Sequence, residues 1–141
     1  MKKHCARKIR PLKIPVTPGL LDQFAQELHF TLMAAGLGSF SKTSFDKIGG
    51  CLNCIYGALV LRPPKDTSIM LVIEGAMRAM NECGQRGTRS GIWSLTTLER
   101  AAVSAGVQKS EEALVALDVM VLFESMQLLK ARQIAEEMKA A

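Results

Sequence analysis

Apolar residues recur at helical spacing in five stretches of the chain, and this pattern predicts five helices. In the first stretch, Thr17 and Pro18 supply a capping hydroxyl and a proline at the first helical position. Gly36 and Gly38 predict where this helix ends. The apolar positions between these signals share one helical face, and they are Leu21, Phe24, Ala25, Leu28, Leu32 and Ala35.

The second stretch has the alternating three- and four-residue spacing of a bundle seam. Thr43 and Asp46 form a capping-box-like pair that predicts its start, and Pro63 begins a pair of prolines that ends it. Gly49 and Gly50 inside this helix each cost about 1 kcal/mol, a cost that is tolerable if a neighbouring helix packs closely there. The seam residues are Phe45, Ile48, Leu52, Ile55 and Leu59.

The third stretch repeats this spacing and begins beside a polar pair. Either Asp66 or Thr67 is expected to cap the helix. The segment 84–91 contains three glycines and two arginines, and its composition predicts a loop. Ile92 and Trp93 are then expected to return to the core. The seam residues of this helix are Ile69, Ile73, Ala76, Met80 and Cys83.

The last two stretches predict long helices. Thr96 and Glu99 form a capping box for the fourth, which we expect to continue past Gly106 to about Leu117. Asp118 is expected to cap the fifth. One apolar stripe of this helix contains Val119, Leu122, Met126 and Leu129.

Five helices with short connections predict an all-α fold, a roughly up-and-down five-helix bundle. The composition agrees, because only 5% of the 141 residues are aromatic while helix-forming residues are plentiful. We expect one helical-bundle domain over residues 17–141, preceded by an extended arm over residues 1–16. Long amphipathic helices often pair with a copy of themselves, which leaves a homodimer as an alternative to a monomer.

The net charge of +5 comes from one end of the chain. Six basic residues and no acid lie within residues 1–13, whereas the rest of the chain is nearly neutral. Such an arm predicts contact with an acidic protein surface or a nucleic acid. We expect residues 9–16 to dock on the body because they are apolar, and residues 1–8 to meet the partner. The candidate binding residues are Lys2, Lys3, Arg7, Lys8, Arg10 and Lys13, with Arg86 and Arg89 in the glycine-rich loop.

The segment 98–115 resembles a helix-turn-helix motif with its turn at Gly106. An apolar residue should follow ten positions after Ala102, but Glu112 stands there, next to Glu111. Two carboxylates on a recognition helix would repel the phosphates of DNA. These acids favour the alternative of one continuous helix that tolerates a glycine.

Few residues offer catalytic or metal-binding chemistry. Cys51 and Cys54 lie three residues apart inside a predicted helix, and zinc would need two more ligands. Cys83 and His29 are the other candidates in the body, and Cys83 belongs to a core seam. We therefore interpret these cysteines as buried thiols of a reduced, cytoplasmic protein. No nucleophile, base and acid form a plausible set, so we predict no enzymatic activity, no cofactor and no metal site.

Methionine is frequent and predicts an adaptable interior. If a methionine face of the third helix is exposed, it would instead mark a groove for a partner. The longest apolar stretch, residues 51–61, is too short to cross a membrane. The methionines expected in the interior are Met33, Met70, Met77, Met80, Met120 and Met126.

Three stretches, GLLDQFAQELH, GAMRAMN and GIWSLTTLERAAV, resemble parts of short helical proteins carried by bacterial phages and plasmids. The resemblance implies an accessory factor of a mobile element that acts by binding, and it implies no site residues. The leading prediction is a non-enzymatic adaptor or inhibitor that binds a protein. The alternative is a nucleic-acid-binding accessory protein that uses the basic arm and the loop of Arg86 and Arg89.

Overall fold

The computed structural model describes residues 15–140, and the six basic candidates of the arm lie outside this range. Within it the secondary structure is helical apart from one isolated bridge between Pro15 and Asp118. The expected all-α fold with five helices is therefore confirmed. The helices are α1 (Pro18–Gly36), α2 (Lys42–Leu61), α3 (Ser68–Ser90), α4 (Thr97–Ala116) and α5 (Val119–Ala140).

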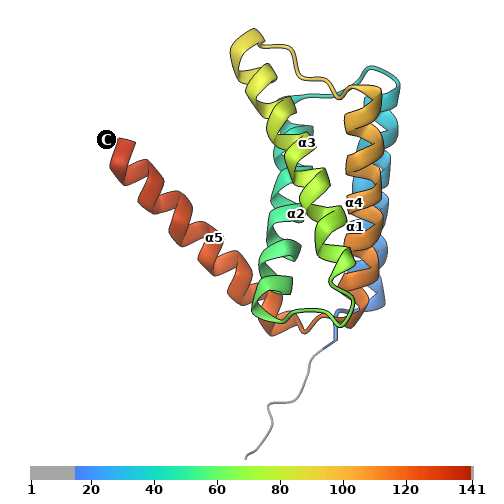
Figure 1. Cartoon of the computed structure of the whole chain (residues 1–141), viewed down its shortest axis with the longest axis vertical. Helices are drawn as coiled ribbons and strands as arrows, with labels where there is room; N and C mark the ends of the chain where they lie inside the picture. Colours follow the sequence, from blue (N-terminus) through green and yellow to red (C-terminus); the bar gives the residue numbers. More distant parts are fainter. Residues whose placement is uncertain (1–14, 141) are drawn as a thin grey trace, which may run out of the picture.

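Four upright helices form the body, and the fifth leaves it at an angle (Figure 1). α4 is central, because it packs extensively on α3, also on α1, and to a lesser extent on α2. α1 hardly touches α2, while α5 packs on α2 and then diverges from it (Figure 1). The side chains with almost no exposure include Leu28, Ile48, Leu52, Ile73, Val103 and Val107.

Most of the helix starts follow from capping chemistry. The Thr17 hydroxyl accepts a hydrogen bond from the Leu20 N–H, as expected. The predicted start of α2 was wrong: Thr43 lies inside the helix, and Ser41 and Ser44 form the capping box instead. Ser41 Oγ accepts from the Ser44 N–H at 3.2 Å, and Ser44 Oγ accepts from the Ser41 N–H at 3.4 Å. A serine at the third helical position can replace the acid that usually closes such a box.

At the start of α3, both candidate residues contribute. Thr67 occupies the cap position without a side-chain bond, while Asp66 Oδ1 accepts from the Ser68 N–H at 3.0 Å. The predicted cap of α5 is also confirmed, since Asp118 Oδ1 accepts from the Met120 N–H at 3.0 Å.

The glycine-rich segment 84–91 is the last part of α3, so its interpretation as a loop was wrong. α3 continues to Ser90 and ends at Gly91, which has a left-handed backbone with φ of 73°. A Cβ at Gly84 would lie 2.7 Å from the Phe45 ring, and one at Gly87 would lie 2.5 Å from the Trp93 ring. These two glycines therefore seat aromatic rings against the helix instead of loosening it.

Gly106 likewise serves close packing and not a turn. α4 runs unbroken through it, so the helix-turn-helix interpretation is wrong and the continuous helix is confirmed. A Cβ on Gly106 would collide with the Ala76 side chain of α3. The glycine thus lets the two helices approach closely, with the Glu111 and Glu112 side chains on the same continuous helix.

Other packing expectations are confirmed only in part. No neighbouring atom lies within 4 Å of a Cβ placed on Gly49 or Gly50, so no other helix packs closely against these glycines. Trp93 is half-buried, but Ile92 is 68% exposed instead of returning to the core. Val16 is buried, in keeping with a docked end of the arm, while residues 1–14 of the arm lie outside the described residues.

The methionines divide between interior and surface. Met80 is buried, and Met70 and Met77 are half-buried. The expectation of an interior position was wrong for the three others, Met33, Met120 and Met126, which are exposed. None of the helices within residues 15–140 combines the length and the apolar character that crossing a membrane requires.

Candidate functional site

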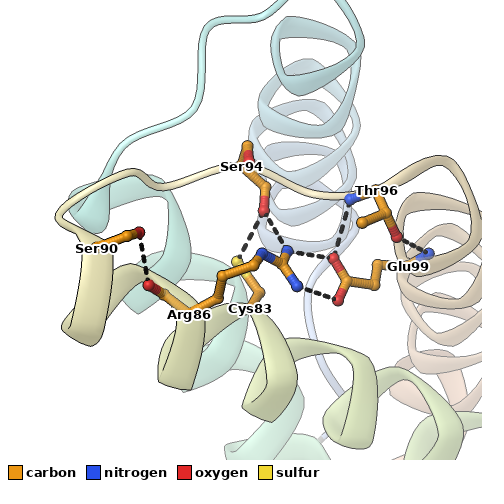
Figure 2. A network of polar contacts seen from close by, with 6 residues as sticks. All are labelled: Cys83, Arg86, Ser90, Ser94, Thr96 and Glu99. Carbon is orange, nitrogen blue, oxygen red and sulfur yellow. Dashed lines mark hydrogen bonds and ion pairs between the residues drawn. The ribbon is translucent and has the colours of Figure 1, made fainter.

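Arg86 of α3 holds the start of α4 in place through Glu99 (Figure 2). Its guanidinium donates from Nη2 to Glu99 Oε1 at 2.5 Å and from Nη1 to Oε2 at 3.0 Å, a two-pronged ion pair. Nη2 also donates to the Ser94 carbonyl at 2.8 Å. The Glu99 side chain is only 7% exposed. The contact therefore ties the α3–α4 connection to both helices.

This ion pair makes Arg86 less available to bind an external anion. The hydrogen bonds from Arg86 hold the pKa of Glu99 below its usual range, so the carboxylate is charged at neutral pH. The positive charge of Arg86 is thus balanced inside the protein. Contact of Arg86 with an external anion stays a prediction, and it would compete with Glu99.

Arg89 has a different setting, one helical turn from the ion pair. It is exposed, and its Nε–H donates a long hydrogen bond to the Gln85 carbonyl at 3.4 Å. Its guanidinium lines a hollow on the surface of α3. The structure therefore separates two arginines that the sequence placed in one loop.

A groove runs between α2 and α3 and consists of two adjoining hollows that share Phe45 and Asn81. Their volumes are about 650 and 280 Å³. The lining residues are Phe45, Gly49, Leu52 and Asn53 of α2 with Met77, Met80, Asn81, Gly84, Gln85, Thr88 and Arg89 of α3. We call this surface the α2–α3 groove.

The chemistry of the α2–α3 groove suits a peptide segment. Phe45, Met77 and Met80 provide apolar walls, and methionine side chains adapt to different shapes. Asn81 and Gln85 provide donors and acceptors. At Gly49 the space is open, so another backbone can come near α2. The lining contains one cation and no acid.

Two further hollows of the described residues carry less chemistry. One lies between α1 and α4, where His29 and Arg100 line it beside apolar side chains. The other lies where the α2–α3 connection meets the end of α4. There Asp66 accepts from the Ser68 N–H and hydroxyl, and Glu112 pairs with a lysine, so these acids serve local structure.

The cysteines and His29 are spread over separate contacts. Burial raises the pKa of the Cys51, Cys54 and Cys83 thiols, which makes them poor nucleophiles. Cys83 Sγ donates to the Ser94 carbonyl at 3.3 Å. His29 Nε2 forms a close pair with the Glu111 carboxylate across α1 and α4. Over residues 15–140, no three His, Cys, Asp or Glu side chains are arranged to hold a metal ion.

Comparison with known protein families, with curated proteins and with solved structures finds no significant match to this chain.

Sequence reasoning missed the α2–α3 groove as a site, although one signal pointed to it. A methionine face on the third helix was expected to mark a groove if it were exposed, and Met77 is half-buried on that wall. Phe45 was assigned to the seam, and the amides were not singled out. Nothing in the periodicity of either helix shows that Phe45 and Asn81 meet across the groove.

Proposed function

We propose that this protein is a non-enzymatic adaptor or inhibitor that binds a helical segment of a protein partner in the α2–α3 groove. The observation that carries the proposal is a groove with methionine and phenylalanine walls, amide groups and open space at Gly49. Amphipathic helices bind such grooves through apolar side chains at positions i, i+3 or i+4, and i+7.

The charge of the groove indicates which charges a partner helix should carry. Arg89 lies at one end, and no lining residue is acidic. A partner helix with an apolar stripe and an Asp or Glu near the Arg89 end would place opposite charges together. The role of accessory factor in a mobile element, which the sequence resemblance implies, is compatible with such binding and stays a prediction.

The proposal is tested with the partner recovered from the native host, purified and bound again to the full chain. Asn81→Lys places a long charged side chain in the groove, and we expect an affinity loss of about tenfold or more. Gln108→Lys is the matched control, since it makes the same change from an exposed amide on α4 outside the lining. Equal losses in both variants would contradict binding in the groove.

Methionine-methyl NMR locates the contact independently of any variant. Partner binding should shift the resonances of Met77 and Met80, which line the groove. The methyl groups of Met120 and Met138 on α5 should keep their positions. Shifts confined to α5 would assign the partner to another surface and overturn the groove.

Binding of nucleic acid is the alternative function. The sequence of residues 1–13 favours it, because this segment has six basic residues and no acidic one. Of the two cations expected to support the arm, Arg86 is paired with Glu99, so an external anion would compete with that carboxylate.

A further inference from the structure

The second half of α5 lies outside the body of the protein (Figure 1). Among residues 117–129 some side chains pack on α2, but residues 130–140 are all exposed. A helical segment of about eleven residues is marginal in water without a packing partner. The projecting half of α5 therefore needs a surface to cover it.

A stripe that is apolar except for Gln127 follows the side of α5 that faces away from α2. Its members are Met120, Phe123, Gln127, Ala131, Ile134 and Met138, and all six are exposed. They are spaced three, four, four, three and four residues apart, so they stay on one face of a helix. Val121 and Ser125, which are buried against the body, lie about half a helical turn from this stripe.

We propose that the α5 stripe binds the α5 stripe of a second copy in an antiparallel pair centred near Leu129. Read from its C-terminal end, the stripe has nearly the same spacing as from its N-terminal end. Each position then differs by at most one residue, or about 1.5 Å along the helix axis. The stripe is therefore complementary to itself, as a two-fold interface requires. The level pairs are Met120 with the second copy's Met138, Phe123 with its Ile134, and Gln127 with its Ala131.

The charged residues of α5 do not oppose this pairing, because none of them belongs to the stripe. Glu124 and Lys130 flank it on opposite sides, and Glu136 lies about half a helical turn from it. α5 itself carries three acids and three bases, so the helices do not repel each other through net charge.

The geometry of the whole chain permits this pairing. The stripe lies opposite the face that packs on α2, so the two bodies would lie on the outer sides of the paired helices. Each projecting half would then lie along the packed half of the other α5. This arrangement gives the projecting half its surface without moving any helix of the body.

The oligomeric state of the full chain tests the proposal. We expect the wild type to have the mass of two chains by light scattering, and Ile134→Glu to weaken the pair by about tenfold or more. Ile134 is 57% exposed and lies on the projecting half, so its replacement leaves the fold intact. Gln133→Glu is the matched control, because it adds the same charge next door but off the stripe. A wild-type monomer up to its solubility limit overturns the proposal.

Crosslinking tests the orientation. Chains with Met120→Cys and chains with Met138→Cys are mixed and oxidised, and peptide mapping separates the new bonds from the native cysteines. We expect disulfides between position 120 of one chain and position 138 of the other. Bonds between two copies of position 120 would show a parallel pair and overturn the register. The pairing is independent of the α2–α3 groove, since Asn81→Lys should leave the dimer intact.

Discussion

The Glu99 carboxylate satisfies groups on two elements at once. Its Oε1 accepts from the Thr96 N–H at 2.9 Å, which closes the capping box of α4. Both of its oxygens also accept from Arg86 of α3. A nearly buried carboxylate is tolerated here because every charge-bearing oxygen has a donor. One side chain, Glu99, therefore both caps α4 and joins α4 to α3.

Removing the charge of Glu99 should destabilise the fold. Glu99→Gln keeps the volume but leaves the Arg86 cation without its anion, and we expect a loss of about 2–3 kcal/mol in the free energy of unfolding. Glu112→Gln removes an exposed carboxylate that pairs with Lys109, and it should cost less than about 0.5 kcal/mol. Urea unfolding at neutral pH measures both. Equal effects would show that the Arg86 pair adds nothing beyond a surface contact.

Acid should remove the same contribution. The pKa of Glu99 is lowered from its usual 4.5 by the hydrogen bonds of Arg86. Its stabilisation is therefore complete above the unfolded-state pKa, and it is lost as the pH falls through the lowered folded-state pKa. The stability difference between wild type and Glu99→Gln should shrink below about pH 4.5. Unfolding curves across this pH range check it, and a constant difference would contradict the assignment.

The end of α3 shows how a helix can use glycine as a packing surface. Gly84 and Gly87 lie one turn apart and receive the rings of Phe45 and Trp93, whose centroids are 5.1 Å apart. The aromatic pair thus joins α2, α3 and the α3–α4 connection. Helix propensity alone disfavours these glycines, but the contacts they permit outweigh that cost.

Two glycine substitutions in α3 should have opposite effects. Gly87→Ala places a Cβ against the Trp93 ring, and overpacking of this kind costs about 1–3 kcal/mol. Gly75→Ala meets no atom within 4 Å, so it should stabilise the protein by about 0.5–1 kcal/mol through helix propensity. Thermal unfolding measures both changes. Stabilisation by both would mean that Trp93 does not rest on Gly87.

The whole molecule consists of a nearly neutral helical body, a basic arm and a projecting helix. The body offers the α2–α3 groove, and α5 offers a separate apolar stripe. These two surfaces lie on different helices. Substitutions can therefore test the proposed partner binding and the proposed self-association one at a time.

Binding to nucleic acid, if it occurs, should depend on the arm and on salt. Gel shifts of duplex DNA with the full chain should weaken with salt at a log–log slope of roughly −0.9 for each phosphate neutralised. Deletion of residues 1–13 should abolish the shift, while Arg89→Gln should reduce it modestly. Absence of any shift at low salt, with duplex or single strands, would end the nucleic-acid alternative.

Local signals in the sequence determined the helices of this protein. Thr17 with Pro18, Thr96 with Glu99, and Asp118 start helices because a side chain supplies the hydrogen bond that the first turn lacks. Apolar periodicity located the core residues of α2 and α3, because residues three or four apart lie on the same face of a helix. The basic arm was also evident, since charge is counted directly along the chain.

Only the tertiary structure decided what the glycines, Arg86 and α5 do. Gly84 and Gly87 look like loop residues until Phe45 of α2 and Trp93 of the connection after α3 come to rest on them. Arg86 looks like a free cation until α4 brings Glu99 to it. The sequence indicates the local preference of each residue, whereas these roles depend on which side chains the packed helices bring together.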